Sequence, residues 1–277
     1  MPRGAGFGYP STMVRIACCQ LDPTIGDLAV NAAVIEAQIR DAVDAGADVI
    51  VLPELATSGY MLADADEARG VALTPADPAF TKWSAAVNNS IVIGGFCELG
   101  DDGRLYNSAV MVDAAGVLAC YRKTHLWDRE KLIFTPGDAL PPVVKTKHGA
   151  IAVMVCYDLE FGELTRRVAL EEAELIAAPV NWPLFPRPEG EHPGEVITAM
   201  STARTNKVAI ACCDRAGVER GQHWTEGTAI IDPDGWVVAS AGPGTAMAVA
   251  DVDLAATHDK TLTEFVDLFA DRRVDLY

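Results

Sequence analysis

A carboxylate, an ammonium group and a thiol each follow a segment that is typical of a buried strand. These side chains are Glu54, Lys123 and Cys156. In open α/β folds, ligands bind beyond the carboxyl ends of strands, so three such ends can bring these groups to one substrate. A thiol, a base and a cation together provide what nucleophilic attack on a carbonyl-like carbon requires.

Each of the three residues also has a structural interpretation when it is taken alone. A cysteine that ends an apolar run is usually a small core side chain, so Cys156 by itself proves little. Lys123 stands in the basic run Tyr121–Lys123, which is typical of a solvated strand end. Glu54 must either reach solvent or be buried with partners, and burial would raise its pKa toward that of a useful general base. The functional interpretation therefore depends on all three residues together.

Apolar periodicity divides the chain into alternating strands and helices. Asp27 can cap a first helix, whose apolar residues recur every three or four positions from Leu28 to Val43, and Gly46 ends it. The further predicted helices are Ala79–Val87, Glu163–Glu172 and Glu195–Asn206. The predicted strands are Val14–Gln20, Asp48–Glu54, Ser90–Glu98, Leu105–Asp113, Val117–Lys123, Ile151–Cys156, Leu175–Val180, Val208–Asp214, Gly227–Asp232 and Trp236–Ala241. This order, interrupted by short hairpin turns, indicates an α/β fold of mixed sheets covered by helices.

The composition favours a sizeable core and small-molecule partners. The chain has 277 residues, of which 50% are hydrophobic, and a formal net charge of −17. No linker-like segment divides it. The negative charge argues against binding to nucleic acid or to an anionic membrane surface, because phosphate contacts need clustered Lys and Arg. We therefore expect small molecules or further copies of the chain as partners.

The cysteines predict a reducing environment. Seven is an odd number, most of them lie within apolar runs, and no secretory leader precedes them. Residues 1–12 are rich in Gly and Pro and are expected to form a flexible N-terminal arm. No segment approaches the ~18 apolar residues of a membrane span. The expected location is the cytoplasm.

Metal and cofactor enzymes are poorly supported by the motifs. The five histidines are scattered, and neither the Cys-x-x-Cys nor the His-Glu-x-x-His spacing of metal sites occurs. There is also no Gly-x-x-x-x-Gly-Lys phosphate loop. We expect neither a metal nor a cofactor.

The order of the three chemical segments resembles the nitrilase superfamily of carbon–nitrogen hydrolases, and in particular its amidases. The matching segments are Leu52–Glu54, Tyr121–Leu126 and Cys156–Asp158. Supporting matches are Tyr106–Ser108, Phe134–Asp138, Asn181–Pro183, and Gly227 followed by Asp232–Gly235. The resemblance covers residues 13–254 and implies a four-layer α-β-β-α sandwich that assembles at least into a dimer.

The resemblance also implies roles for individual residues. Cys156 is the nucleophile, and Glu54 is the base that takes its proton and returns it to the departing amine. Lys123 and the backbone N–H of Tyr157 bind the oxyanion. Glu130 orients the substrate, although a glutamate in a charged run is more often a surface residue. Tyr157 and Trp182 are expected to contact the substrate.

The residues after the nucleophile bear on the substrate. Tyr157-Asp158 resembles amidases, whereas true nitrilases usually have Trp-Glu there. Relatives that recognise a carboxylate often carry an arginine shortly beyond, and this chain has Leu159–Glu163 instead. If Glu160 faces the pocket, it favours a neutral or cationic amide; if it faces solvent, this argument does not hold. A carbamoyl compound or a nitrile remains the alternative substrate.

Two further questions stay open from the sequence. A non-catalytic binding protein on the same fold is the rival from another class, although such a protein needs no base beside a thiol. Residues 255–277 form a C-terminal tail in which Thr261–Tyr277 is amphipathic. This tail is expected to pack either at a subunit interface or on its own subunit. Trp127, Phe185 and His192 are placed near the pocket mouth by the resemblance.

Overall fold

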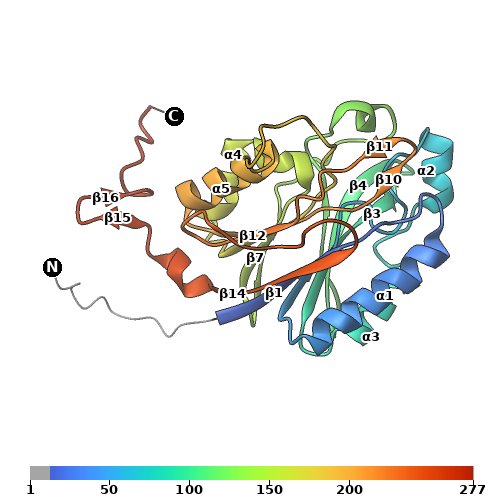
Figure 1. The fold of residues 1–277 in the computed structure, drawn as a ribbon, viewed down its shortest axis with the longest axis horizontal. Coiled ribbons are helices and arrows are strands. Elements are labelled where there is room, and N and C mark those ends of the chain that lie inside the picture. The colour runs from blue at the N-terminus through green and yellow to red at the C-terminus, as the bar shows by residue number, and fades with distance from the viewer. Residues whose placement is uncertain (1–12, 277) are drawn as a thin grey trace.

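The computed structural model describes residues 13–276 (Figure 1). The predicted arm, residues 1–12, lies outside the described residues, as does Tyr277. Two six-stranded sheets pack face to face, and helices cover the outer face of each one. The chain therefore has the four-layer α-β-β-α arrangement that was expected.

The first sheet has a parallel centre with antiparallel edges. Strands β1, β2 and β3 run parallel, whereas β14, β4 and β5 are added by antiparallel pairing. In spatial order the strands are β14 (Ala246–Asp253), β1 (Met13–Gln20), β2 (Val49–Val51), β3 (Ile91–Leu99), β4 (Leu105–Asp113) and β5 (Gly116–Arg122). The helices that cover this sheet are α1 (Leu28–Asp44) and α3 (Pro78–Ala86) (Figure 1).

The second sheet repeats this plan. Strands β7, β8 and β9 run parallel, and antiparallel strands flank them. In spatial order the strands are β13 (Val237–Ser240), β12 (Ala229–Ile231), β9 (Ala209–Cys213), β8 (Leu175–Pro179), β7 (Gly149–Val153) and β6 (Val143–Thr146). The helices over this sheet are α4 (Gly162–Leu170) and α5 (Gly194–Asn206).

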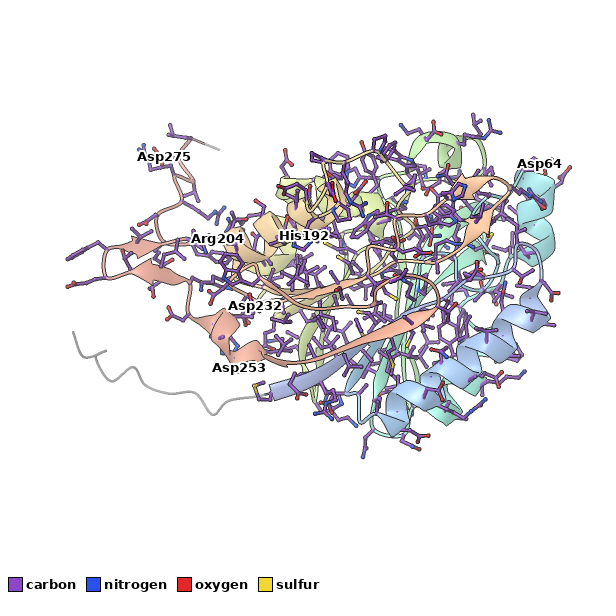
Figure 2. All side chains as sticks on the ribbon, in the orientation of Figure 1. Asp64, His192, Arg204, Asp232, Asp253 and Asp275 are labelled. Atoms are coloured by element: carbon purple, nitrogen blue, oxygen red, sulfur yellow. The ribbon has the colours of Figure 1, made fainter. Side chains whose placement is uncertain are left out.

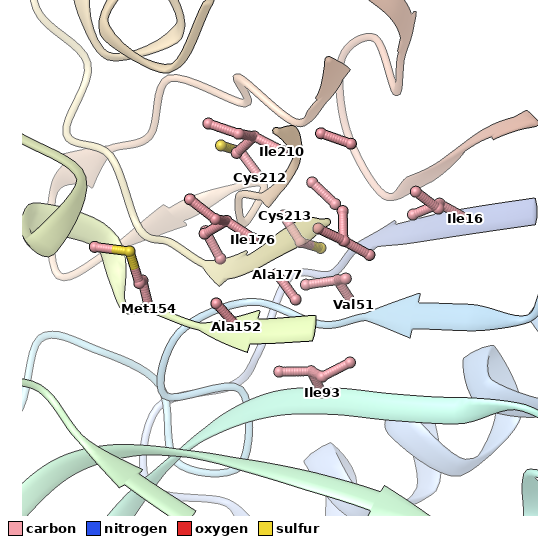
Figure 3. Packing of buried hydrophobic residues seen from close by; sticks show 14 of the residues in the cluster. Ile16, Val51, Ile93, Ala152, Met154, Ile176, Ala177, Ile210, Cys212 and Cys213 are labelled. Atoms are coloured by element: carbon pink, nitrogen blue, oxygen red, sulfur yellow. The ribbon is translucent and has the colours of Figure 1, made fainter. Parts of the chain in front are cut away.

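Alternation along the strands of the first sheet builds two cores. Ile16, Val51 and Ile93 are buried against the second sheet (Figure 3). Ile50, which is next to Val51, points the other way and packs with Trp83 of α3. Because successive strand residues face opposite sides, a sheet buried on both faces needs a continuous apolar run.

The first helix begins and ends where the sequence predicts. The Asp27 side chain accepts a hydrogen bond of 3.0 Å from the Val30 N–H, which satisfies one of the free donors of the first turn. Gly46 follows the helix with a φ of 78°, a conformation that glycine adopts without a steric penalty.

Several strands are shorter than predicted, and for two of them the difference matters for the site. The predicted strands Asp48–Glu54 and Ile151–Cys156 end in site residues, whereas in the structure β2 ends at Val51 and β7 ends at Val153. The Leu52 N–H still bonds to Ile93 of the first sheet, whereas the Glu54 N–H reaches the carbonyl of Val180 in the other half at 3.4 Å. The segment after β2 thus bridges the two halves, because the Pro53 carbonyl still accepts from the Gly95 N–H of β3.

Several short elements have no counterpart in the sequence prediction. Strands β6 and β14 were also not predicted. The short elements are α2 (Ala65–Val71), β10 (Val218–Glu219), β11 (Gln222–His223), β15 (Thr261–Thr263), β16 (Val266–Asp267), and the 3₁₀ helices η1 (Asp128–Leu132), η2 (Cys156–Glu160) and η3 (Leu254–His258). Two of these, η1 and η2, carry residues of the candidate site.

The C-terminal tail extends away from the sandwich (Figure 1). Figure 2 labels Asp253, the last residue of β14 before the tail, and Asp275 within the tail. It contains the small hairpin of β15 and β16. Phe265 at the hairpin turn is 84% exposed, whereas Phe269 lies under the cationic groups of Arg166 and Lys260 of the same chain. Part of the tail therefore packs on its own subunit. None of the helices described is long and apolar enough to cross a membrane.

Candidate active site

The three predicted chemical groups lie together at one end of the two sheets. Glu54 follows β2 by three residues, Lys123 comes directly after β5, and Cys156 is the first residue of η2, just beyond β7. Glu54 and Lys123 are fully buried, and Cys156 is 6% exposed. Strands from both sheets thus deliver these side chains to one place, as ligand sites beyond strand ends require.

Lys123 bridges two carboxylates inside the protein. Its Nζ is 2.7 Å from Glu54 Oε1 and 2.8 Å from Glu130 Oε1. Glu130 comes from η1 and is only 4% exposed although it stands in a charged run. A buried cation with two carboxylate partners is not a solvated strand end, so the structural interpretation of Lys123 is wrong.

Neutral donors complete the contacts of these carboxylates. Asn107 Nδ2 donates to Glu54 Oε1 at 2.7 Å, and the hydroxyl of Tyr60 donates to Glu130 Oε1 at 2.5 Å. The other Glu130 oxygen accepts the Trp127 N–H at 3.0 Å. Glu54 Oε2 is buried and has no hydrogen-bond partner among the residues that the structure describes. This oxygen is the one that can take a proton.

Burial and neighbouring charges set the protonation of the site. Burial raises the pKa of Glu54 to about 7, against the opposing charge of Lys123, and the like charge of Glu130 adds to the rise. Burial alone would lower the pKa of Lys123, but the charges of Glu130 and Glu54 outweigh it and hold the pKa well above its usual value. Lys123 is therefore a permanent cation, and Glu54 exchanges its proton near neutral pH.

Cys156 sits at a sharp change of backbone direction. Its φ of 47° is in the left-handed region, which is uncommon for a residue with a side chain. Burial raises the pKa of its thiol well above the usual range, and Glu54 adds to the rise. The resting group is thus a thiol that needs a base. Because η2 begins at Cys156, the N–H of Tyr157 lies in the first turn, where backbone donors lack partners within a helix.

Asn181 links the nucleophile to the base. Cys156 Sγ contacts the Asn181 carbonyl at 3.8 Å, and Asn181 Nδ2 donates to the backbone carbonyl of Glu54 at 2.8 Å. The amide oxygen of Asn181 is buried and has no hydrogen-bond partner among the described residues. One residue therefore contacts both groups, the nucleophile through its backbone carbonyl and the Glu54 backbone through its side-chain NH₂, and its amide oxygen stays available as an acceptor.

Asp158 anchors the lysine segment to the helix of the nucleophile. Its carboxylate accepts the Tyr121 hydroxyl at 2.9 Å, the Thr124 hydroxyl at 3.0 Å and the His125 N–H at 3.0 Å. It also accepts the Val155 N–H at 3.2 Å within its own helix. These bonds hold the strand end that carries Lys123 against the turn that carries Cys156.

A cavity of about 360 Å³ opens onto Cys156. Both predicted substrate contacts, Tyr157 and Trp182, line it. The other lining residues are Trp127, Glu160, Asn181, Pro183, Phe185, Gly194, Glu195 and Thr198. His192, labelled in Figure 2, is exposed and is not among the lining residues. Four of its lining residues are aromatic, namely Trp127, Tyr157, Trp182 and Phe185, and the cavity has the size of a small-molecule site.

Asp214 supports the wall of this cavity from behind. It is fully buried and accepts the backbone N–H groups of Trp182 at 3.0 Å, Arg215 at 2.9 Å and Gly227 at 2.9 Å. Burial raises its pKa to about 7, and these hydrogen bonds oppose the rise. The position of the Trp182 indole thus depends on a carboxylate outside the cavity.

Sequence reasoning missed several members of this arrangement. In the sequence prediction, Asp214 was the last residue of a strand and Glu195 the first residue of a helix, and neither was given a role at the site. Tyr60 carried no signal, because it lies in a loop between Gly59 and Met61 and belongs to no periodic pattern. Asn107 was quoted in a supporting match without a role. No cluster of three or more His, Cys, Asp and Glu side chains suited to a metal ion occurs within residues 13–276.

Comparisons with known proteins agree with this geometry. Residues 15–260 match the family described as carbon-nitrogen hydrolase. The chain is 34% identical over 271 residues to a nitrilase from Pyrococcus abyssi, with 96% of this chain and 99% of the relative covered. It is 31% identical over 235 residues to an (R)-stereoselective amidase from a Pseudomonas species, covering 83% and 81% of the two chains.

A solved structure shows the same fold. It is a mutant of the amidase from Nesterenkonia sp. AN1, in which the acetamide moiety of fluoroacetamide is covalently added at the active-site cysteine. The TM-score is 0.76 at 25% identity, with 96% of each chain covered. The expected resemblance and the four-layer fold are therefore confirmed, and the chain belongs to the carbon–nitrogen hydrolase family.

Proposed function

We propose that this protein is an amidase that converts a small neutral or cationic amide to a carboxylic acid and ammonia through a thioester on Cys156. The observation that carries the proposal is the buried array of Glu54, Lys123 and Glu130 beside a thiol that opens onto a small aromatic cavity. A fold kept only for binding has no need of a base with a pKa near 7 next to a buried thiol.

The first half of the reaction forms the thioester. Glu54 takes the thiol proton as Cys156 Sγ bonds to the amide carbon, and the carbonyl oxygen becomes an oxyanion between Lys123 Nζ and the Tyr157 N–H. The proton on Glu54 then passes to the nitrogen as the carbon–nitrogen bond breaks, so ammonia leaves. Asn181 Oδ1, which has no partner among the described residues, can accept an N–H of the amide during this step.

The second half restores the enzyme. A water molecule gives a proton to Glu54 and attacks the thioester carbon, and the same two donors stabilise the new oxyanion. The carbon–sulfur bond breaks, the proton on Glu54 returns to sulfur, and the carboxylic acid leaves. Glu130 is a positioning residue in this scheme. It holds Lys123 in place, and it is not among the residues that line the cavity.

The alternative substrates are a carbamoyl compound and a nitrile. The nitrile has a specific observation in its favour, namely the 34% identity to a protein called a nitrilase. A carbamoyl amino acid is less compatible, because the residues that line the cavity include two glutamates and no lysine or arginine that would bind its carboxylate.

We also infer the organisation of the chain around this site. Residues 13–254 form the hydrolase domain, and the tail, residues 255–277, contributes to a homodimer interface. Exposed apolar side chains of the hairpin support this inference; they are Leu262, Phe265 and Val266. A cytoplasmic location is supported by the seven cysteines, all of which are free. Size-exclusion chromatography with light scattering, with and without residues 255–277, tests the interface.

The experiment for the activity is ammonia release from a panel of butyramide, butyronitrile and N-carbamoyl-β-alanine. We expect turnover of butyramide that is abolished in Cys156→Ala. Cys120→Ala is the matched control, because Cys120 lies in β5 outside the cavity and is expected to leave the rate unchanged. Hydroxylamine added to the reaction should divert part of the product to a hydroxamate, since it competes with water for the thioester. Turnover that survives Cys156→Ala would disprove the proposal.

A further inference from the structure

Two carboxylates face the same cavity as the nucleophile. Glu160 is the last residue of η2, the helix that Cys156 begins, and Glu195 is in the first turn of α5. Both line the cavity of about 360 Å³, and every other side chain that lines it is uncharged or the Cys156 thiol itself. The catalytic scheme uses neither glutamate.

The environment of this pair is unfavourable for two negative charges. Burial raises the pKa of Glu160, and the charge of Glu195 raises it further, while a hydrogen bond from Thr198 opposes the rise. No lysine or arginine is among the groups that shift it. A cation placed in the cavity would remove this repulsion, because like charges that share a site are relieved by a positive partner.

The rest of the cavity also suits a ligand with N–H groups. Asn181 is 1% exposed, lines the cavity, and has a buried amide oxygen without a partner among residues 13–276. Four aromatic side chains line the same cavity; they are Trp127, Tyr157, Trp182 and Phe185. Aromatic faces attract ammonium groups by cation–π interactions. An acceptor beside the nucleophile, a carboxylate at the other end of η2 and aromatic side chains around the same cavity together suit a molecule with nitrogen donors at its two ends.

We propose that this site selects a primary amide that carries an ammonium group at the end remote from the amide, and that Glu160 and Glu195 bind that ammonium group. The inference rests on the proposed amidase function and names its substrate class. The 3₁₀ helix η2 separates Cys156 from Glu160 by four residue steps, which is roughly 8 Å along its axis. An amide with a spacer of about four methylene groups matches that separation.

The test compares two amides of equal length, 5-aminopentanamide and hexanamide, in which an ammonium group replaces a methyl group. The readout is kcat/KM for 5-aminopentanamide divided by kcat/KM for hexanamide. Contacts that the cavity makes with both amides cancel in this ratio, so it reports the effect of the ammonium group. Exposed ion pairs are weak, so we expect the ratio to fall about threefold to fivefold in Glu160→Gln or Glu195→Gln and roughly tenfold in the double variant. The fall should lie in KM, and it should shrink as salt screens the charges.

A matched control separates the pocket charge from the overall charge of −17. Glu163→Gln removes one negative charge from α4, outside the cavity, and is expected to leave the ratio unchanged. Dissociation constants of both amides for Cys156→Ala, measured by calorimetry with and without Glu160→Gln, show whether the effect is on binding.

The outcomes distinguish the inference from the function on which it rests. If hexanamide is hydrolysed but the ratio is the same in wild type and in the double variant, the inference is wrong and the amidase function stands. If Glu163→Gln lowers the ratio as much as Glu160→Gln does, the selection comes from the whole surface and the inference is also wrong. If the wild type hydrolyses butyramide but neither of these amides, the inference is wrong and the amidase function stands. If butyramide is not hydrolysed either, the amidase function itself fails.

Discussion

Replacing Glu130 by glutamine tests how the buried charges set the proton affinity of the base. In the wild type, the pKa of Glu54 of about 7 means that the carboxyl group is protonated, and therefore inactive as a base, below that pH. We expect kcat/KM to rise with pH through about 7. Glu130→Gln removes a like charge near Glu54 and should lower that pKa, so that activity persists to lower pH.

The size of the shift follows from the geometry. The carboxylate oxygens of Glu54 and Glu130 lie 2.7 and 2.8 Å from the same Lys123 Nζ. They are therefore no more than roughly 5.5 Å apart, where two unit charges at an effective dielectric constant of ~20 repel by about 3 kcal/mol, or about two pKa units. Because each charge is shared by two oxygens, we expect the acid limb to move down by about one to two units.

The same substitution should also lower the maximal rate. A glutamine at this position can still accept from Lys123 and Tyr60 through its oxygen. Its NH₂ group would then face the Trp127 N–H, and two donors cannot form a hydrogen bond with each other. One donor is left unsatisfied, which costs about 1–3 kcal/mol in a buried position. We expect kcat at the optimum to fall roughly tenfold to a hundredfold, as for other losses of precise positioning.

The assay is ammonia release from butyramide, with kcat/KM measured from about pH 5 to about pH 9. Asp128→Asn is the control, because it removes an exposed charge from the same 3₁₀ helix and asparagine tolerates the positive φ of that residue. Its acid limb should stay in place. An acid limb that does not move in Glu130→Gln, or moves to higher pH, would refute the electrostatic reasoning.

The remaining predictions concern the base and two supporting residues. Glu54→Gln should lower kcat by at least about 10³ while circular dichroism shows a folded protein, since it removes the proton acceptor; turnover within tenfold of wild type would contradict this role. Tyr60→Phe removes the hydroxyl that donates to Glu130, so chemical denaturation should show a loss of about 1–3 kcal/mol, and an unchanged midpoint would argue against that bond. Asp158→Asn should lower the free energy of unfolding by about 2–4 kcal/mol, because one amide cannot accept all the donors that now point at the carboxylate, and equal melting temperatures would count against it.

The sequence could predict the parts of the fold that depend on local patterns. The first helix was found with its cap at Asp27 because the cap, the apolar period and Gly46 agree. Helix α2 was missed, although Asp64 and Glu67 form a capping pair at its start, because its seven residues bury only Ala68 and Val71. Short elements of this kind take their stability from the contacts around them.

The candidate site was predicted where a chemical group ends an apolar run, and missed where it does not. Glu54 and Cys156 follow such runs, so the pattern makes them candidates, and their functional interpretation came from the combination with Lys123. Glu130 lies in a charged run and could be proposed only by resemblance. Its burial depends on side chains that the local sequence does not place beside it, namely Lys123 seven positions earlier and Tyr60 seventy positions earlier. Tyr60 and Asp214 act through long-range contacts that no local pattern encodes.

The orientation of Glu160 shows a different limit. The sequence left open whether its carboxylate faces the pocket or solvent, because a five-residue 3₁₀ helix has no reliable periodicity. The structure places it in the cavity wall, where it is also exposed to solvent, and Glu195 lines the same cavity from a helix 35 positions later in the chain. Such a pair arises only from the packing of α5 on η2.

The central claim is that the acyl group of an amide becomes bonded to one particular sulfur atom during turnover. Acid quenching of the enzyme during steady-state hydrolysis of butyramide, followed by peptide mass spectrometry, tests it most directly. We predict a butyryl group on the peptide that contains Cys156, released by hydroxylamine, in wild type and in Cys120→Ala. Ammonia release at full rate with the butyryl group on another residue, or with no hydroxamate formed when hydroxylamine is present, would contradict the account.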